Sequence, residues 1–590
     1  MRYTFTLFRN NAFRLLFRQY SVATSNGSAV KVVSIKDDDS IKVTFKYLNS
    51  YNLIVKRPKD EGVHISLSHI KAKTELINKR EEIRRGIVNK YAMTAQTVVE
   101  TYLDGDTEVS LIKNNEVMNE NIPNIEAWSQ ASMLKVGNDL YEIKYNTPTV
   151  VELSLPRHII AGCPIRPHFI LECASLDDCK FTWYRSVTQI DVSRYLNSER
   201  KHDILIDDDK YWLKVNEGFI YFTMKDDIGC YLKVVCTPKQ EDRTGPDFAV
   251  ESDSVVEAGP EMFPFEERHI YTKTLSDKDS LRCISYNVLA NVYVEKRNFP
   301  YCSAKARHIH YRKQLLLKEI LGYNSDIICL QEVQERIFEH DLAKVLRLAG
   351  FDGFYAKKGG RRFEGVATFY RTSKYRVLDN YRMLLNEIVR EKEVFLNLTS
   401  KVSGNCKTMS TLLAQDTVIQ AILLEDFNGR KILVANTHLY SNKDTPEVRL
   451  IQAAFCLCYI EHIIKMNVDS MPVLFCGDFN SLPASSAYDF ITSGIFECCS
   501  SWKSDSVPGT DTILRHNLHL SSACGTPEYT NYTEEFCGCL DYIFYSKNHL
   551  QVTDVVPMPS HEKVTAQVGL PNEHFPSDHI ALVCTLKWKT

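Results

Sequence analysis

The sequence predicts an α/β region from about residue 274 to residue 590, preceded by a mainly β region and a small α+β unit. Three changes of pattern predict this arrangement. From residue 274 onward, long apolar strands alternate with helical segments, which is typical of an α/β sheet. Residues 98–260 show short strands and turns, as in an immunoglobulin-like sandwich. Residues 21–97 combine alternating apolar strands with a charged helical segment, and we find no internal repeat.

The composition excludes several classes of protein. With roughly 150 residues per domain, a chain of 590 residues has room for about two to four domains. It carries 71 basic and 74 acidic residues, a net charge of −3, which excludes a uniformly basic nucleic-acid binder. No apolar run reaches the roughly 20 residues of a membrane-spanning helix, so we expect no membrane partner. We also expect a monomer.

The cysteines indicate a reducing compartment. The 18 cysteines are scattered, and many lie inside apolar strands, as Cys329 and Cys476 do. This distribution is typical of small buried side chains and not of a disulfide framework. The close pairs lack the spacing of a zinc site, so we expect no structural zinc.

The first 36 residues contain no acidic side chain. Arginines alternate there with Phe and Leu, and Ser and Thr follow, which is typical of a mitochondrial transit peptide. The segment around Tyr20 resembles a matrix-processing site, so we expect a transit peptide over residues 1–20 and a location in the mitochondrial matrix. The alternative is a basic first helix of a cytosolic domain.

Six apolar strands of the α/β region each have polar residues at or beside one end. These residues are Asn287, Glu332, Asn436 with His438, Asp478 with Asn480, Asp541, and Asp578 with His579. Strand ends in α/β sheets commonly converge on one crevice, and buried carboxylates there need a cation. Oxygen and carboxamide ligands without a thiolate favour Mg²⁺ or Mn²⁺ over zinc. Such a set supports hydrolysis of a phosphoryl ester by an activated water.

The same residues carry a resemblance. Six motifs occur in order: Ser285-Tyr-Asn-Val-Leu-Ala290, Leu330-Gln-Glu-Val333, Asn436-Thr-His-Leu-Tyr440, Cys476-Gly-Asp-Phe-Asn-Ser481, Leu540-Asp-Tyr-Ile-Phe544 and Pro576-Ser-Asp-His579. Together they resemble the deadenylase branch of the endonuclease/exonuclease/phosphatase superfamily. The resemblance implies a two-sheet α/β sandwich. The region upstream of it resembles the mitochondrial 2′,5′-phosphodiesterases of that superfamily.

The resemblance implies a metal site. Glu332 is expected to be the principal Mg²⁺ ligand, with Asn287 beside it. Asp478 is expected to lie at the metal and to orient or deprotonate the attacking water. Asn480 is expected at the same metal site, where it holds the scissile phosphate.

The resemblance also implies roles for the imidazoles. We expect His579, oriented by Asp578, to bind the metal or to stabilise the developing negative charge. Asp541 is expected to hold an imidazole or a water in place. His438 is expected to stabilise or protonate the leaving oxygen, and Asn436 to donate to the phosphate. For Asp541, His438 and Asn436 the alternative is an ordinary hydrogen bond at the end of a strand.

Substrate recognition requires an aromatic surface and basic groups. Phe536 lies where the deadenylases place a base-stacking ring, and Asn531 is a candidate contact to a base edge or a ribose. Residues 357–362 form a basic stretch that is either a contact to the RNA backbone or a solvated loop. Arg449 is either a phosphate ligand or one half of a structural ion pair.

The function that the resemblance implies is that of a Mg²⁺-dependent phosphodiesterase acting on single-stranded RNA. It would remove AMP from the 3′ or 2′ end of oligoadenylate or of a poly(A) tail. The residues do not distinguish 2′,5′ from 3′,5′ linkages. The alternatives are another phosphodiesterase of the superfamily, such as an abasic-site endonuclease or a lipid phosphodiesterase, and a catalytically inactive RNA-binding scaffold.

Overall fold

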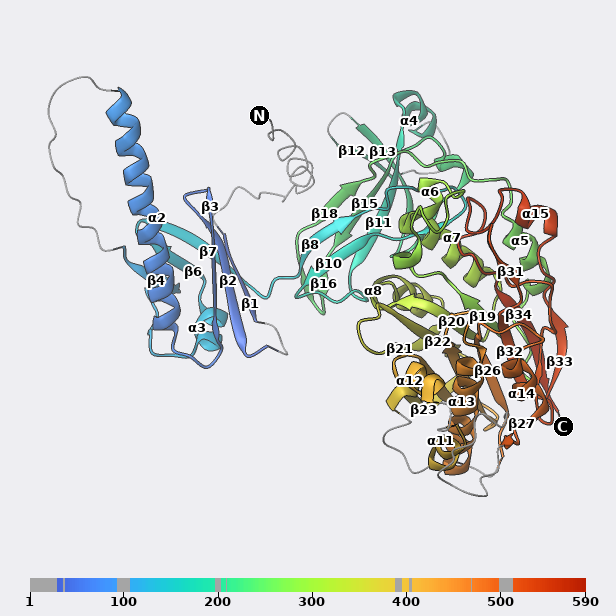
Figure 1. Cartoon of the computed structure of the whole chain (residues 1–590). Helices are drawn as coiled ribbons and strands as arrows, with labels where there is room; N and C mark the ends of the chain where they lie inside the picture. Colours follow the sequence, from blue (N-terminus) through green and yellow to red (C-terminus); the bar gives the residue numbers. More distant parts are fainter. Residues whose placement is uncertain are drawn as a thin grey trace, which may run out of the picture. The chain divides into compact units, whose positions relative to one another are not determined.

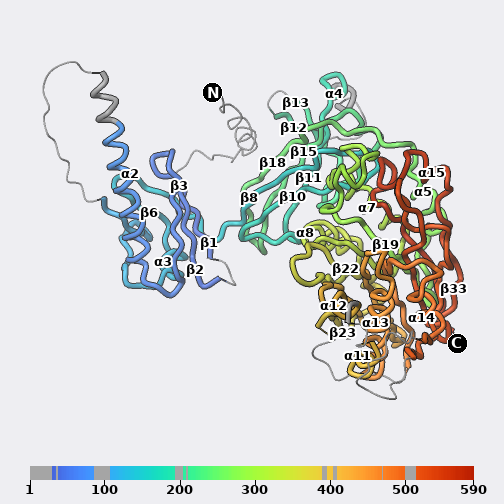
Figure 2. Tube along the Cα trace, in the orientation of Figure 1, coloured from blue at the N-terminus to red at the C-terminus, as the bar shows by residue number. Residues whose placement is uncertain are grey.

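The structure is a computed structural model that describes residues 29–34, 38–92, 107–196, 203–207, 210–387, 395–402, 406–467, 470–497 and 513–589. The expected transit peptide, residues 1–20, lies outside the described residues. The chain divides into two compact units, each considered by itself (Figures 1 and 2). The first unit comprises Met1–Leu155, Pro167–Phe219 and Lys233–Glu251, and the second comprises Pro156–Arg166, Ile220–Leu232 and Ser252–Thr590. Within the described ranges, no helix has the length and apolar character needed to cross a membrane.

A seven-stranded sheet opens the first unit, with strand order β3-β2-β1-β7-β6-β4-β5. Its strands are β1 (Ala29–Ser34), β2 (Ser40–Tyr47), β3 (Tyr51–Pro58), β4 (Val109–Lys113), β5 (Glu116–Val117), β6 (Met133–Val136) and β7 (Asp139–Tyr145). Helices α2 (Val63–Ala92) and α3 (Asn124–Gln130) accompany it, and Trp128 of α3 lies fully buried in the core that they share with the sheet.

The pairing of this sheet corrects the boundary expected between residues 97 and 98. Strand β1 pairs in parallel with β7, with Ala29 opposite Glu142 and Val32 opposite Tyr145. Strands β4 to β7 therefore belong to the α+β unit, whereas the sequence pattern placed them with the β-sandwich. The α+β unit extends to Tyr145 because β1 pairs with β7, a strand about 110 residues further along the chain.

The rest of the first unit is mainly β, as predicted. A five-stranded sheet has the order β12-β13-β11-β15-β18, and β8 pairs separately with β10. The strands are β8 (Thr149–Ser154), β10 (His168–Glu172), β11 (Lys180–Val187), β12 (Ile204–Asp207), β13 (Lys210–Glu217), β15 (Leu232–Thr237) and β18 (Phe248–Glu251). Phe169 packs against Phe181 and Phe219, with ring centroids 6.0 and 5.5 Å away, and so joins β10 to the larger sheet.

Two six-stranded sheets form the centre of the second unit. The first has the order β21-β22-β20-β19-β34-β33 and the second β23-β24-β25-β26-β32-β29. The strands of the first are β19 (Ser280–Asn287), β20 (Ile327–Gln334), β21 (Phe351–Lys357), β22 (Glu364–Arg371), β33 (Leu550–Val555) and β34 (Leu582–Trp588). Those of the second are β23 (Tyr375–Leu384), β24 (Val418–Asp426), β25 (Lys431–His438), β26 (Val473–Asp478), β29 (Leu520–Ser522) and β32 (Asp541–Ser546).

The two sheets pack face to face between layers of helices, which confirms the predicted two-sheet α/β sandwich. One core lies between the sheets and includes Cys283 and Cys329 of the first sheet with Val434 and Ile543 of the second. Helix α7 (Ile309–Gly322) packs on the outer face of the first sheet and α13 (Pro446–Asn467) on the outer face of the second. Figure 1 shows α7 above and α13 below the sheets.

The alternation of side chains along the strands decides where the polar residues lie. On β19 and β25, Cys283 and Val434 face the opposite sheet, and every second residue shares that face. Asn287 and His438 therefore lie on the inner face of the sandwich, at the ends of their strands. Asp541 shares the inner face with Ile543 on β32, so three strands deliver polar side chains to one end of the inter-sheet layer.

Candidate active site

The strand register brings the polar ends of the second sheet together. His438 is paired with Asp478 across β25 and β26, and Asp478 is paired with Asp541 across β26 and β32. A Cβ atom on Gly477 would lie 2.3 Å from the carbonyl oxygen of Thr437, so only glycine allows β25 and β26 to approach this closely. The three side chains consequently occupy neighbouring positions on one edge of the sheet.

Asn287 connects this edge to the first sheet. Its Nδ2 donates to Oε1 of Glu332 and to Oδ2 of Asp478, each at 3.0 Å. The backbone N–H of Ala290 donates to the other oxygen of Glu332 at 2.9 Å. One amide group therefore holds carboxylates from both sheets, and these two carboxylates face each other across the end of the sandwich.

Irregular backbone aims two of these residues. Glu332 has φ 56° and lies where the β20–β22 register shifts between Leu330 and Val333. Such a bulge turns a side chain away from the regular alternation, and bulges of this kind are common beside active sites. Asn480 has φ 48°, its backbone N–H donates to Oδ1 of Asp478, and its Nδ2 donates to the carbonyl oxygen of Leu439. Residues with side chains rarely adopt positive φ, and such strain concentrates at functional sites.

Asp541 orients His579. The Oδ2 atom of Asp541 lies 2.8 Å from Nδ1 of His579 and also accepts a hydrogen bond of 2.6 Å from the hydroxyl of Thr530. The other ring nitrogen, Nε2, lies 3.6 Å from Oδ2 of Asp478. His579 is thus held between two carboxylates, with Nε2 on the side of the predicted catalytic centre.

The expectation that Asp578 orients His579 is wrong. The carboxylate of Asp578 accepts a hydrogen bond of 3.1 Å from Nδ2 of Asn531. Asp578 and His579 are sequence neighbours, but Nδ1 of His579 contacts Asp541 whereas the carboxylate of Asp578 contacts Asn531. Asn531, expected to contact the substrate, lines the pocket with its amide already donated to Asp578.

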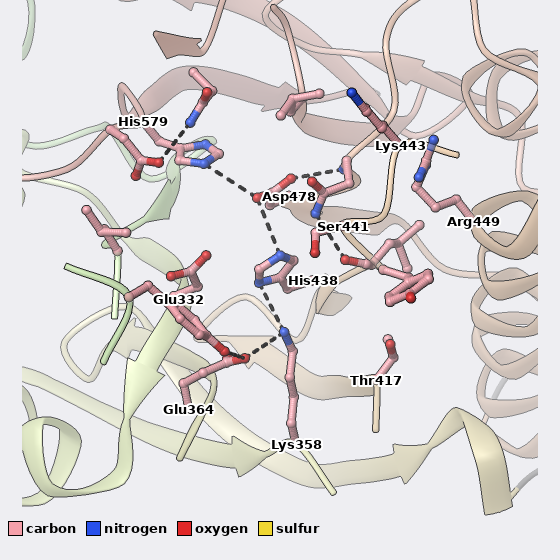
Figure 3. A pocket seen from close by; sticks show the side chains of 18 of the residues that line it. Glu332, Lys358, Glu364, Thr417, His438, Ser441, Lys443, Arg449, Asp478 and His579 are labelled. Atoms are coloured by element: carbon pink, nitrogen blue, oxygen red, sulfur yellow. Dashed lines mark hydrogen bonds and ion pairs between the residues drawn. The ribbon is translucent and has the colours of Figure 1, made fainter. Parts of the chain in front are cut away.

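His438 belongs to a continuous set of polar contacts that includes Lys358 and Glu364, neither of which is among the predicted catalytic residues. Lys358 Nζ lies 3.2 Å from Nδ1 of His438 and 2.8 Å from Oε1 of Glu364. On its other side, Nε2 of His438 lies 3.6 Å from Oδ2 of Asp478. Figure 3 shows these contacts as a continuous line from His579 through Asp478, His438 and Lys358 to Glu364. Lys358 lay within the predicted basic stretch, whereas the only signal for Glu364 was its position at the start of a buried strand.

The two central carboxylates are hard to ionise in the absence of a cation. Burial, together with the nearby carboxylates of Glu364 and Asp578, raises the pKa of Glu332 to about 7. Burial and the charge of Asp541 raise the pKa of Asp478 to about 6. Both values show that the site concentrates negative charge, which a bound cation would stabilise.

The two imidazoles have opposite tendencies. Burial disfavours the charged form of His579, but Asp541, Asp578 and Asp478 outweigh it, so the pKa of His579 is raised well above its usual value. Burial and the positive charge of Lys358 lower the pKa of His438 well below its usual value. The site therefore favours the protonated form of His579 and the neutral form of His438, which suits one ring to act as an acid and the other as a neutral hydrogen-bond donor.

The donor set fits a hard divalent cation. Glu332 and Asp478 approach the same amide group. The ligand atoms of Asp478, Asp541 and His579 lie within 4.8 Å of one another. The buried Oδ1 atom of Asp541 has no hydrogen-bond partner. The second cluster of potential ligands in the described residues, Cys283, Cys329 and Cys476, lies in the core between the sheets and offers only sulfur. Carboxylate oxygens with a carboxamide beside them suit Mg²⁺ or Mn²⁺.

A cavity of about 720 Å³ opens over these residues. This volume lies in the range of roughly 300–1,000 Å³ that is typical of small-ligand sites. Its lining includes Glu332, Asp478, Asn480, Asp578, His438 and His579, together with Asn531, Phe536 and Arg449. The ring of Phe536 is 40% exposed at the edge of the cavity, as a stacking surface requires, and a Cβ on Gly538 would lie 2.9 Å from it.

Asn436 does not reach the cavity, contrary to expectation. It is fully buried, its Nδ2 donates to the carbonyl oxygens of Leu330 and Ala367, and its Oδ1 accepts from Gln331 at 2.9 Å. All of these partners lie on the opposite sheet. Asn436 therefore joins the two sheets beneath the site and has no polar atom left for a phosphate.

Comparisons with known proteins agree with this geometry. The sequence profile of the Endonuclease/Exonuclease/phosphatase family matches residues 284–579, and that of the 2′,5′-phosphodiesterase 12-like N-terminal domain matches residues 147–257. A curated relative, 2′,5′-phosphodiesterase 12 of Mus musculus, is 38% identical over 491 residues, which cover 82% of this chain and 80% of the relative. The chain belongs to the endonuclease/exonuclease/phosphatase family. It resembles the 2′,5′-phosphodiesterase 12 proteins within that family over most of its length.

Further matches cover about half of the chain. The CCR4-Not complex 3′-5′-exoribonuclease subunit Ccr4 of Schizosaccharomyces pombe is 32% identical over 352 residues, 54% of this chain and 50% of that protein. Among solved structures, ANGEL2, described as a 2′,3′-cyclic phosphatase, is 26% identical with a TM-score of 0.45, covering 53% of this chain and 96% of that chain. Membership of this family identifies the chain as a hydrolase of phosphodiester bonds with a divalent-metal site.

The raised pKa of Asp478 predicts a gain of stability when its charge is removed. Unfolded Asp478 ionises near its ordinary value of 3.8, whereas in the folded protein its pKa is about 6. The metal-free protein therefore loses stability as pH rises between these values. We expect Asp478→Asn to raise the free energy of unfolding by about 1–3 kcal/mol at about pH 8 and to make no difference near about pH 4.

Urea denaturation in the presence of a chelator measures this effect. Added Mg²⁺ should stabilise the unsubstituted protein more than the Asn variant, since the cation offsets the carboxylate charge. A variant that is less stable than the unsubstituted protein at about pH 8 without metal would contradict the assignment of a repulsive carboxylate cluster.

Proposed function

We propose that this enzyme is a Mg²⁺-dependent phosphodiesterase and 3′-to-5′ exoribonuclease that releases AMP from the end of single-stranded oligoadenylate. Its substrates include 2′,5′-linked oligoadenylates and the poly(A) tails of mitochondrial RNA. The observation that carries the proposal is the meeting of Glu332 and Asp478 at Asn287, beside a cavity with an exposed ring at its edge. The names of the relatives, a 2′,5′-phosphodiesterase and a 3′-5′-exoribonuclease, support both linkages.

Glu332, Asp478, Asn287 and Asn480 would hold the ion near the carboxylates that converge on the amide of Asn287. When bound, Mg²⁺, or Mn²⁺ in its place, supplies positive charge that offsets the charge of the phosphate and of the attacking oxygen. The chain's own residues supply positioning and proton transfer. Asn480, with its backbone fixed at positive φ, presents its side chain to the same cavity.

Hydrolysis requires a base for water and an acid for the leaving oxygen. Asp478 is placed to accept a proton from water as the water oxygen attacks phosphorus. The bond from phosphorus to the ribose O3′ or O2′ then breaks, and the leaving oxygen takes a proton. His579 is suited to donate it, because Asp541 binds Nδ1 and the remaining Nε2–H faces the site.

His438 is suited to a different task. An ammonium group can only donate a hydrogen bond, so Lys358 fixes Nδ1 of His438 as an acceptor and leaves the hydrogen on Nε2. The neutral ring therefore offers one N–H toward Asp478 and the cavity. We infer that His438 stabilises the negative oxygens of the phosphate by this hydrogen bond and does not transfer a proton.

Product analysis tests the proposed activity. Purified enzyme with Mg²⁺ or Mn²⁺ should release AMP from 3′,5′-linked and 2′,5′-linked oligoadenylates, and the ratio of the two rates gives the linkage preference. We expect Glu332→Gln to lower kcat by at least about 100-fold, since it removes a charge at the reacting centre.

Glu335→Gln is the matched control, because Glu335 lies three residues away and pairs with Lys357 outside the cavity. Release of AMP that is equal in the two variants would show that another protein causes the activity. No release from any oligonucleotide by the folded, metal-supplied enzyme would refute the nuclease proposal.

Phe536 gives a second test, of adenine recognition. Loss of a base-stacking ring costs about 1–3 kcal/mol per base, so we expect Phe536→Ala to reduce kcat/KM for oligoadenylate roughly 5- to 150-fold. The loss should be smaller for oligouridylate, whose bases stack less strongly. Phe427→Ala removes a ring that is 72% exposed in the turn between β24 and β25 and serves as the control. An unchanged ratio of adenylate to uridylate rates would contradict this role for Phe536.

We propose the mitochondrial matrix as the location of the enzyme, on the basis of the acid-free, arginine-rich first 36 residues. A fluorescent protein fused after residue 36 should accumulate in mitochondria and lose the leader. The same fusion with Arg2, Arg9, Arg14 and Arg18 changed to Glu should stay in the cytosol. Cytosolic fluorescence of the unchanged fusion would contradict the proposed location.

A further inference from the structure

Arg449 is a buried cation at the edge of the cavity, on the first turn of α13. Its side chain is 7% exposed. One terminal nitrogen donates to the backbone carbonyl of Asn442, while the buried Nε has no hydrogen-bond partner. Among the described residues, no ion pair with a carboxylate is found for Arg449. The expected alternatives were a structural ion pair and a phosphate ligand, and the first of these is not observed.

The positive charge of the Arg449 guanidinium is only partly balanced by its protein contacts. Burying a charge without a partner is costly, and one backbone carbonyl offsets only part of the cost. Burial lowers the pKa of Arg449, and the more distant carboxylates of Glu447 and Asp478 oppose this effect. An anion that enters the cavity from solvent would offset the remaining cost of burying this charge.

Other groups near Arg449 favour an anion. Lys443 and Ser441 line the same cavity on the loop that leads into α13. The 22-residue helix also directs its positive N-terminal end toward this loop. In the view of Figure 3, Lys443 and Arg449 lie on one side of Asp478 and Glu332 on the other. Glu332 and Arg449 therefore lie on opposite sides of Asp478 in the cavity lining.

We propose that Arg449, with Lys443 and Ser441, forms an anion subsite that binds a second phosphate group of the substrate, next to the scissile phosphodiester. This inference rests on the proposed function. The planar fork of a guanidinium matches the oxygens of a phosphate, and the cavity of about 720 Å³ includes both ends of the site. The second phosphate has two possible sources. One is the 5′-phosphate of the nucleotide whose ribose oxygen is the leaving group. The other is a terminal phosphate on the ribose of the AMP unit that is released.

Three dinucleotides distinguish these sources. Diadenosine monophosphate has only the scissile phosphate, a second compound adds a 5′-phosphate, and a third adds a phosphate at the free ribose end. We expect one phosphorylated dinucleotide to show a kcat/KM at least about tenfold above that of the unphosphorylated one, as suits a hydrogen-bonded charge pair. The compound that gains identifies the source.

Arg449→Met should reduce this gain to about onefold, and Arg449→Lys should retain part of it. Lys465→Met, which changes an exposed cation at the other end of α13, should preserve the full gain. The selectivity among the three compounds is the informative quantity. A variant that merely loosened the loop at Asn442 would lower the rates for all three compounds alike.

Binding separates the subsite from catalysis. Dissociation constants of the three dinucleotides, measured by calorimetry in the Glu332→Gln background with and without Arg449→Met, should show the same gain and the same loss. If diadenosine monophosphate is cleaved but a second phosphate improves neither rate nor binding, the subsite is refuted and the proposed function stands. If no dinucleotide is bound or cleaved, both proposals fail.

Discussion

The hydrogen bonds of one amide group, Asn287, determine the geometry of the site. Asn287 holds Glu332 from its own sheet and Asp478 from the opposite sheet at the same distance, 3.0 Å. The contact with Asp478 exists only while the two sheets keep their spacing and register. Asn436 provides that constraint one layer deeper, because it ties β25 to carbonyl groups of β20 and β22. The close approach of β25 and β26 at Gly477 adds a second constraint, which keeps His438 beside Asp478.

Electrostatics divides the cavity into regions with different tasks. The crowded carboxylates of Glu332 and Asp478 destabilise the metal-free fold and thereby favour a cation. Asp541 favours the charged form of His579, whereas burial and Lys358 favour the neutral form of His438, so two identical side chains are suited to different donor roles. This division depends on residues that do not themselves contact the reacting atoms. Substrate selection is separated in the same way, since the exposed ring of Phe536 is suited to a base and Arg449 to a phosphate.

The sequence pattern predicted the α/β region and the strand-end residues because alternation and polar strand ends are local signals, and the family resemblance implied the two-sheet sandwich. The pattern could not predict how deep a residue lies. Asn436 and His438 share one face of β25, but only the second reaches the cavity. Asp578 was predicted to orient His579 because the two residues are adjacent in sequence. The partner of His579 is instead Asp541 on β32, 38 residues earlier. The contact of Glu364 with Lys358 and the pairing of β1 with β7 are also long-range, and no local pattern reveals them.

The antiparallel pairing of β19 with β34 has a consequence for synthesis. Asn287 ends β19, yet the strand beside it, residues 582–588, leaves the ribosome almost 300 residues later. His579 lies three residues before that strand begins. All the other strands of the first sheet are synthesised before β34, so until then β19 has no partner strand on that side. A nascent chain that ends before this strand therefore lacks both the β34 neighbour of β19 and its hydrogen bonds to that strand.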